Sequence, residues 1–234
     1  MSAIIVTGAS SGIGKQTAIK LKKSGFLVVG TYNSNESSAI SIKSEYGIPF
    51  IRCDVSCNES LINLFETVKK DYGGITAVVA NAGVAIPQKP LIDVNEDEID
   101  KVLSVNLKGT LLTDKVAISY MLSNGGKIIN VSSIFGIEGG SCEAVYSASK
   151  AGIIGLTKAL ADEISSSNVS VCCVCPAFVD TPMTEHLTES DKLDFLENYG
   201  VDKIYSAKDV ASKICQILNS NEPTNGKIIK LYND

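Results

Sequence analysis

A tyrosine and a lysine, Tyr146 and Lys150, stand four residues apart near the start of a run from residue 144 to residue 166. Apolar residues recur through this run at helical spacing, so the two side chains should lie one above the other on a helix. A neighbouring ammonium favours the phenolate, so we expect the pKa of Tyr146 to fall below its ordinary value of about 10. Such a tyrosine can protonate an alkoxide, or deprotonate an alcohol, near neutral pH. The same pair also occurs on ordinary half-exposed helices, so the rest of the chain decides its meaning.

A glycine-rich stretch, residues 7–14, lies between a short apolar segment and a helical pattern that reaches about residue 24. A turn between a strand and a helix is where backbone N–H groups can hold phosphate. Gly8 allows the tight turn, Gly12 lets the backbone approach a pyrophosphate, and Gly14 lets the helix pack closely on the strand. The spacing is G-x-x-x-G-x-G and differs from the commoner G-x-G-x-x-G, so a purely structural turn remains open at this point.

Polar residues at the ends of the next two strands bear on the cofactor. The second strand ends in neutral Asn33 and Ser34, where an acidic residue would bind the adenosine ribose and select NAD. Nothing there repels a 2′-phosphate, which Ser11, Lys15, Asn33 and Ser34 could help to hold. We therefore expect NADP over NAD, by a modest margin because no arginine stands at the expected places. Asp54, after the third strand, could accept a hydrogen bond from an adenine amino group.

Two further polar residues are candidates on position alone. Ser133 follows the fifth predicted strand, and parallel α/β sheets bind ligands outside the carboxyl ends of their strands. Asn106 falls inside a predicted helix, where an asparagine is usually solvated and by itself predicts no role.

Strands and helices must alternate to bring these residues together. The predicted strands cover residues 3–6, 26–31, 48–52, 75–80, 126–131, 169–175 and 227–232. The predicted helices cover residues 14–24, 59–72, 95–123, 144–166, 188–199 and 207–218. This order predicts an α/β fold: a doubly wound, seven-stranded parallel sheet flanked by helices, Rossmann-like, in a single domain over residues 1–234.

Composition excludes several classes of protein. Hydrophobic residues make up 44% of the chain, enough for a large core, yet no run approaches the roughly 20 apolar residues of a membrane span. The chain enters a strand directly after Met1, so we expect no signal peptide and a cytoplasmic protein. The net charge of −5, without a basic cluster, argues against nucleic acid or membrane partners.

Cysteine and histidine usage argues against two kinds of site. Cys172, Cys173 and Cys175 fall in one predicted strand, where neighbours point to opposite faces, so we expect buried thiols and no metal. His186 is the only histidine and lies in a loop-like stretch with no link to Ser133, which argues against a Ser-His-Asp hydrolase. Acid and base chemistry then falls to tyrosine, lysine or carboxylates.

Taken together, these motifs resemble the short-chain dehydrogenase/reductase family, in its single-domain branch, from Ile4 to Tyr232. Residues 7–14 are similar to the family's glycine motif, and Asn81-Ala82-Gly83 to its Asn-Ala-Gly motif. Ser133, Tyr146 and Lys150 resemble its Ser-Tyr-Lys set, and Asn106 falls where the family has a fourth catalytic residue. Residues 176–181 resemble the segment that touches the nicotinamide. The subgroup that the chain resembles most is the 3-oxoacyl-(acyl carrier protein) reductases.

The resemblance implies hydride transfer between a nicotinamide and a carbonyl or alcohol substrate. Ser133 would polarise the carbonyl, and Tyr146 would protonate the alkoxide. Lys150 would lower the Tyr146 pKa and hold the ribose, Asn106 would steady a water that relays protons, and Thr181 would hold the carboxamide. The implied cofactor contacts are Gly8, Ser10, Ser11, Gly12, Ile13, Gly14, Asn33, Ser34, Asp54, Val55, Asn81, Ala82, Gly83, Tyr146, Lys150, Pro176, Val179 and Thr181.

The chain departs from the family at three places, one of which is the region from Tyr199 to Ala207, where the usual Gly-Arg-x-Gly pattern is missing. Ala177 stands where the family usually has glycine, and we expect its methyl to crowd the nicotinamide edge. The chain ends at Asn233-Asp234, short of the tail that normally lines a subunit interface and the substrate pocket. The resemblance implies a homodimer or homotetramer, and the short end leaves the choice between them open.

Other functions remain open. Sugar, polyol and steroid dehydrogenases share these motifs, and a non-catalytic dinucleotide-binding regulator is a second class, although it would have no need for the complete Ser-Tyr-Lys set. Epimerases of the extended branch need a sizeable C-terminal substrate domain, and the 59 residues after Cys175 are too few.

Overall fold

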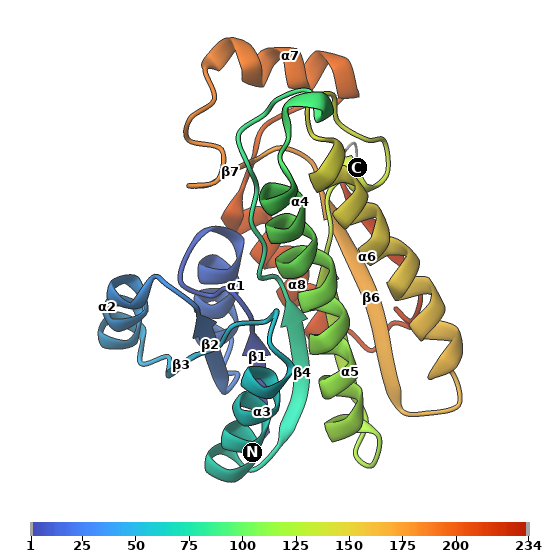
Figure 1. Cartoon of the computed structure of the whole chain (residues 1–234). Helices are drawn as coiled ribbons and strands as arrows, with labels where there is room; N and C mark the ends of the chain where they lie inside the picture. Colours follow the sequence, from blue (N-terminus) through green and yellow to red (C-terminus); the bar gives the residue numbers. More distant parts are fainter. Residues whose placement is uncertain (1, 233–234) are drawn as a thin grey trace.

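The computed structural model describes residues 2–232, so the expectations that rest on Met1 and on Asn233-Asp234 lie outside the described residues. Seven parallel strands form one sheet in the order β3-β2-β1-β4-β5-β6-β9 (Figure 1). The strands are β1 Ala3–Val6, β2 Val28–Tyr32, β3 Phe50–Arg52, β4 Ile75–Ala80, β5 Gly126–Val131, β6 Val169–Pro176 and β9 Ile228–Leu231. The predicted fold class is confirmed: a seven-stranded parallel sheet with helices on both faces.

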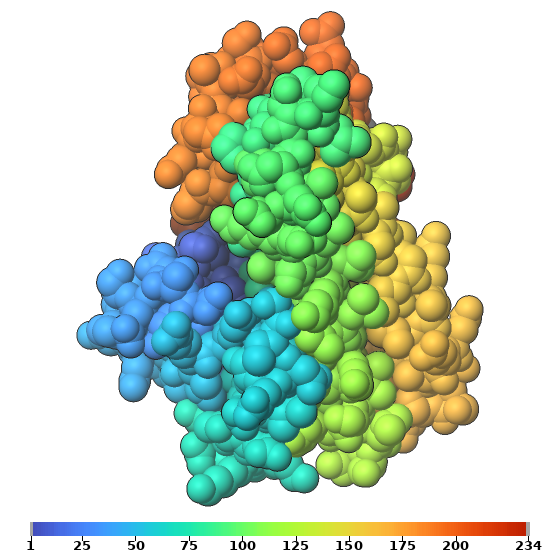
Figure 2. Space-filling view, viewed as in Figure 1, coloured from blue at the N-terminus to red at the C-terminus, as the bar shows by residue number. Residues whose placement is uncertain are grey.

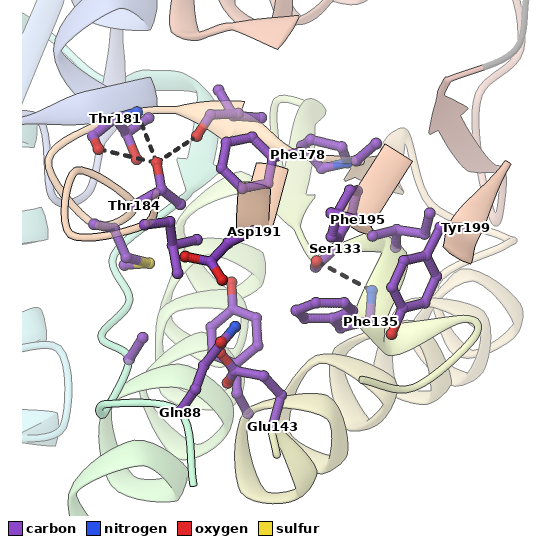
Figure 3. A pocket seen from close by; sticks show the side chains of 18 of the residues that line it. Gln88, Ser133, Phe135, Glu143, Phe178, Thr181, Thr184, Asp191, Phe195 and Tyr199 are labelled. Atoms are coloured by element: carbon purple, nitrogen blue, oxygen red, sulfur yellow. Dashed lines mark hydrogen bonds between the residues drawn. The ribbon is translucent and has the colours of Figure 1, made fainter. Parts of the chain in front are cut away.

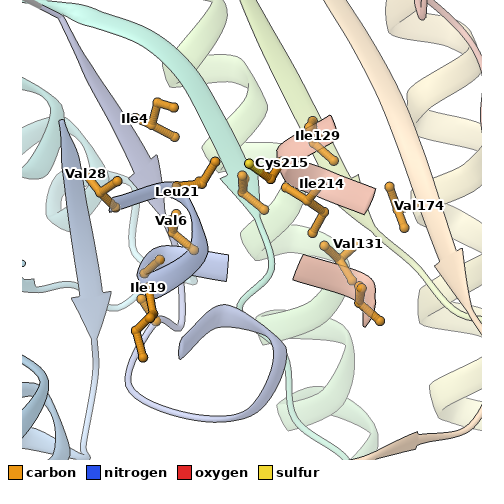
Figure 4. Packing of buried hydrophobic residues seen from close by; sticks show 14 of the residues in the cluster. Ile4, Val6, Ile19, Leu21, Val28, Ile129, Val131, Val174, Ile214 and Cys215 are labelled. Atoms are coloured by element: carbon orange, nitrogen blue, oxygen red, sulfur yellow. The ribbon is translucent and has the colours of Figure 1, made fainter. Parts of the chain in front are cut away.

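Helices cover the sheet in two layers. The layer on one face contains α1 Gly12–Lys23, α2 Glu36–Tyr46 and α8 Ala207–Asn219. The layer on the other face contains α3 Asn58–Tyr72, α5 Gly109–Met121 and α6 Ala144–Glu163. Strand residues alternate between these layers: Ile4 and Val6 pack under α1 and α8, while Ala3 and Ile5 pack under α3 and α5. Figure 4 shows the first of these two cores.

The cysteines of β6 follow the same alternation. Cys172 joins the core under α1 and α8, whereas Cys173 and Cys175 lie on the opposite face with Ile153 of α6. All three side chains are buried, as the sequence predicts.

The structure adds elements that the sequence did not predict. Helix α2 occupies a stretch for which the sequence predicts no element, and a small second sheet pairs β7 Val179–Asp180 with β8 Tyr205–Ser206. The predicted helix over residues 95–123 is divided into α4 Glu96–Val102, a π-helical turn η2 Leu103–Lys108, and α5. Two short 3-10 turns, η1 Leu91–Asp93 and η3 Ile134–Gly136, and the predicted α7 Glu189–Tyr199 complete the elements.

Between residues 2 and 232, no helix combines the length and the apolar character that crossing a membrane requires.

Candidate functional site

The glycine-rich turn between β1 and α1 is held against the end of β4. Gly8 and Gly12 have φ angles of +64° and +49°, in the left-handed region that favours glycine. A side chain at Gly8 would also place its Cβ 2.9 Å from the Ala82 Cα. Asn81 donates from Nδ2 to the Thr7 carbonyl oxygen at 2.9 Å, and the Thr7 hydroxyl accepts from the Asn81 N–H at 2.9 Å. These hydrogen bonds hold the turn in one shape. Because Gly8 and Gly12 have no side chains, a ligand can approach the backbone of the turn closely.

A cavity of about 450 Å³ begins at this turn and runs along the carboxyl ends of the central strands. Most of the predicted cofactor residues line it: Gly8, Ser10, Ser11, Gly12, Ile13, Asn33, Ser34, Asp54, Val55, Asn81, Ala82, Gly83, Tyr146, Lys150 and Thr181. Its left-handed glycines and its course from the strand ends to Tyr146 fit a dinucleotide.

Three predicted cofactor residues do not line this cavity. Gly14 lies beneath the turn, where a Cβ would collide with the Gly8 carbonyl oxygen and the Asn81 side chain. Its role is therefore the close packing of helix on strand that we expected. Pro176 and Val179 line a second cavity.

Sequence reasoning missed several residues at the end of the first cavity that contains Asn33 and Ser34. Thr31 and Asn35 belong to its lining, and Ser38 of α2 donates to the Ser10 carbonyl oxygen at 2.6 Å, which ties α2 to the glycine turn. Arg52, the only arginine of the chain, donates from Nε to the Asn33 carbonyl oxygen at 3.2 Å. The pairing of β2 with β3 places Arg52 beside Tyr32, a neighbour that its sequence position alone did not reveal.

Lys150 is almost completely buried, and its Nζ donates to the Val131 carbonyl oxygen at 2.9 Å. The same Nζ lies 5.5 Å from the centroid of the Tyr146 ring, so the helical spacing brings the two side chains together as predicted. Burial lowers the pKa of Lys150 to about 8, because desolvation disfavours the charged ammonium.

The expected direction of the Tyr146 pKa shift is wrong. Burial raises the pKa of Tyr146 above its ordinary value, the Glu143 carboxylate raises it further, and a hydrogen bond with Ser133 opposes both. The Lys150 ammonium points to the Val131 carbonyl oxygen, so desolvation decides the direction instead of the neighbouring charge. The phenol therefore stays protonated at neutral pH.

The side chain of Asn106 is buried and hydrogen-bonded, and is not exposed to solvent. It is completely buried in the π-helical turn, and its amide oxygen accepts from the Val84 N–H at 2.8 Å. Its Nδ2 donates to the Val84 carbonyl oxygen at 2.9 Å and to the Ser149 hydroxyl at 3.2 Å. The side chain fixes the backbone after the Asn81-Ala82-Gly83 motif, which corrects the expectation of a solvated amide. The role of Asn106 in a proton-relaying water chain stays a prediction.

A second cavity, of about 320 Å³, meets the first at Tyr146. Ser133 lines it and lies at the start of η3, where its Oγ accepts from the Phe135 N–H at 3.2 Å (Figure 3). Ala177 also lines it and packs with Ile134 and Tyr232, so the methyl that we expected to crowd the nicotinamide belongs to a small apolar cluster.

His186, to which we assigned no site, also lines the second cavity. Burial raises the pKa of Glu143 against the opposing effects of a hydrogen bond from Gln88 and of the nearby His186. Hydrogen bonds from Thr188 lower the pKa of Asp191, and His186 adds a smaller effect in the same direction. No signal in the sequence placed His186 there, because the position depends on how the segment before α7 folds back. Over residues 2–232, no group of three or more His, Cys, Asp or Glu residues is arranged to hold a metal ion.

Comparisons with known proteins agree with this geometry. The sequence model of the short chain dehydrogenase family matches residues 2–192. The chain is 34% identical over 216 residues to a 3-oxoacyl-[acyl-carrier-protein] reductase of Thermotoga maritima, covering 90% of this chain and 87% of the relative. It is 38% identical to carbonyl reductase family member 4 of Danio rerio, over 79% of this chain and 78% of the relative. It is 36% identical to an acetoacetyl-CoA reductase of Shinella zoogloeoides, over 79% of this chain and 77% of the relative. The chain therefore belongs to the short-chain dehydrogenase family of NAD(P)-dependent oxidoreductases.

Proposed function

We propose that this protein reduces a carbonyl compound with a reduced nicotinamide dinucleotide, and that 3-oxoacyl thioesters are among the substrates to test first. The observation that carries the proposal is the junction of the two cavities, where Ser133 and Tyr146 are hydrogen-bonded and Lys150 lies one helical turn away. Three relatives named as reductases of carbonyl or 3-oxoacyl substrates support it.

Each residue of the junction has a defined task in this proposal. The bound dinucleotide would supply the hydride. The Ser133 hydroxyl would donate a hydrogen bond to the carbonyl oxygen and polarise it. Tyr146, kept protonated by its raised pKa, would donate the proton that the developing alkoxide needs. Lys150 would hold the ribose, and its positive charge would stabilise the Tyr146 phenolate that forms when the phenol gives up its proton. Asn106 would act as a positioning residue, because its amide holds the backbone at Val84.

The test follows the absorbance of NADPH and NADH with acetoacetyl thioester, aldehyde, ketone and keto-sugar panels. We expect turnover that falls by at least about a hundredfold in Tyr146→Phe, because the variant keeps the ring but cannot donate the proton. Tyr46→Phe, at the end of α2 and away from both cavities, is the matched control. Tight dinucleotide binding without turnover on any panel would favour the non-catalytic regulator instead.

A dehydrogenase acting on a hydroxyl group is the second candidate. A 3β-hydroxysteroid dehydrogenase of Mediterraneibacter gnavus is 34% identical over 83% of this chain and 72% of the relative. The same Tyr146 would then act as a base, which its raised pKa disfavours at neutral pH. Faster oxidation of sugar, polyol or steroid alcohols than reduction of any carbonyl would support this candidate.

For the cofactor we propose NADP over NAD. The neutral Asn33 and Ser34 line the cavity, and Arg52 lies beside Asn33 as the cation that a 2′-phosphate needs. Calorimetric binding of NADP⁺ and NAD⁺ tests it: Arg52→Gln should weaken NADP⁺ by about tenfold and leave NAD⁺ unchanged. Lys43→Gln removes an equal charge from the exposed face of α2 and should change neither affinity. An unchanged NADP⁺ affinity in Arg52→Gln would contradict the role of this arginine.

A single catalytic domain, a cytoplasmic location, and a homodimer or homotetramer complete the proposal.

A further inference from the structure

The second cavity has an acidic wall. Among the residues of the described chain that line it, the charged side chains are the carboxylates of Glu143, Asp191 and Asp194 and the imidazole of His186, without a lysine or an arginine. Asp191 and Asp194 lie on α7 at the mouth, whereas Glu143 is half-buried inside. A ligand that enters this cavity therefore passes carboxylates both at the mouth and inside.

Glu143 is the carboxylate nearest to the chemistry. It directly precedes α6 and stands three residues before Tyr146. Burial raises the pKa of Tyr146 most, and the Glu143 carboxylate raises it further. Gln88 hydrogen-bonds with Glu143, and Figure 3 shows the two side chains together on one wall of the cavity. A substrate whose carbonyl reaches Tyr146 can place a neighbouring substituent close to this carboxylate, because both residues line the same cavity.

The lysines around the cavity do not compensate this charge. Lys192 of α7 is paired with Glu189 at 2.6 Å, and Lys89 is paired with Glu98 at 2.7 Å. Lys150 donates to the Val131 carbonyl oxygen and lines the dinucleotide cavity. Among the described residues that line the cavity, His186 alone has a basic side chain, and this side chain is exposed.

Aromatic rings form another wall of the same cavity. Phe195 stacks on Tyr199 with 4.7 Å between ring centroids and lies 5.3 Å from Phe178 and 5.6 Å from Phe135 (Figure 3). Such a wall favours an apolar or aromatic body, and the faces of its rings also attract cations.

We propose that this cavity takes a carbonyl compound with an apolar or aromatic body that carries a protonated amine, or a weaker hydrogen-bond donor, near the reacting carbonyl. Glu143 is the residue that selects this compound over a carboxylated analogue. The proposal rests on the carbonyl reduction proposed above and names the substrate class of that same site.

Three probes of one shape test the proposal: acetophenones with an aminomethyl, a hydroxymethyl or a carboxylate group in the meta position, the ring position nearest to the carbonyl from which the substituent cannot cyclise onto it. Binding of each to the full chain with saturating oxidised dinucleotide is measured by calorimetry, so the readout does not depend on turnover. The proteins are the wild type, Glu143→Gln, and Glu163→Gln as the matched control. Glu163 is exposed at the far end of α6, so its variant removes the same charge without touching the cavity. Circular dichroism checks that each variant is folded.

We expect the wild type to bind the aminomethyl probe at least about tenfold more tightly than the carboxylate probe, with the hydroxymethyl probe between them. Glu143→Gln should remove most of this ratio, and Glu163→Gln should keep it. Equal affinities, tighter binding of the carboxylate, or no binding of any probe would overturn the proposal. Reduction of the hydroxymethyl probe is measured separately. Binding that depends on the charge of the probe, without reduction, would contradict the proposed function but support the proposed selectivity of the cavity.

Discussion

At the scale of single residues, burial and charge compete at Tyr146 and Lys150. Their spacing of four residues correctly predicts that the side chains meet, because helical geometry is local. It does not predict the direction of the Tyr146 pKa, because desolvation comes from groups that the fold assembles, among them Glu143 and Ser133. Proximity can be derived from the sequence here, whereas the electrostatic environment requires the packed structure.

A second buried titratable residue gives a prediction at the same scale. Asp114 of α5 is completely buried, and its Oδ2 accepts from Asn130 Nδ2 at 2.9 Å. Its Oδ1 has no hydrogen-bond partner among the described residues. Burial raises the pKa of Asp114 from 3.8 to about 7. Between pH 3.8 and about pH 7, the Asp114 carboxyl is protonated in the folded state and ionised in the unfolded state. The contribution of Asp114 to the free energy of unfolding therefore falls as the pH rises through this range and levels off above about pH 7.

Asp114→Asn keeps the shape and removes the titration. We therefore expect the variant to gain stability relative to the wild type as pH rises, by roughly 2 kcal/mol between about pH 5 and about pH 8. Urea unfolding of both proteins at the two pH values measures the difference. A difference that does not change with pH would mean that Asp114 keeps an ordinary pKa in the fold.

At the scale of elements, the seven strands of the main sheet could be predicted to within a few residues, because apolar runs bounded by polar turns define them. Helix α2 could not, since only Ala39 and Ile42 of its eleven residues are buried and its sequence is rich in serine. It forms because Asn35 caps it and Ser38 binds the glycine turn. The π-helical turn η2 was also missed, because apolar periodicity continues through it and only the buried amide of Asn106 marks it.

The π-helical turn gives the prediction at this scale. Asn106→Ala leaves the N–H and carbonyl groups of Val84 without their partners, so we expect a loss of about 1–3 kcal/mol in the free energy of unfolding. Dinucleotide affinity should fall as well, because Val84 and Gly83 line that cavity. Calorimetry and urea unfolding measure the two effects.

Asn95→Ala is the matched control for this variant. Asn95 caps α4, so its replacement should cost about 1 kcal/mol and leave dinucleotide affinity unchanged. An Asn106→Ala protein that binds the dinucleotide like the wild type would show that the loop after β4 holds its shape without the amide.

At the scale of the whole molecule, the site depends on segments far apart in the chain. The two cavities share Ile13, Ser132, Tyr146, Thr181 and Met183, which come from the first helix, the end of β5, α6 and the segment after β7. The sequence predicts this meeting point, because ligands bind outside the carboxyl ends of parallel strands. It does not predict the wall of the second cavity, which depends on where α7 and the residues before it settle over the strand ends (Figure 1).

The last prediction concerns assembly into a homodimer or homotetramer. Helices α5 and α6 lie side by side on the face shown in Figure 2. Leu111 of α5 is 44% exposed, and Ala148, Ala151 and Gly155 of α6 are also exposed. Small side chains let a second copy of the helix pair approach closely, so we expect the wild type to sediment as a dimer or larger species. Ala151→Arg should shift it toward the monomer, because arginine is nearly as good a helix former as alanine but is too long for a close contact. Ser41→Arg, on the exposed face of α2, should leave the sedimentation unchanged. A wild type that sediments as a monomer at every concentration would remove the assembly proposal, and a dimer unaffected by Ala151→Arg would place its interface on another face.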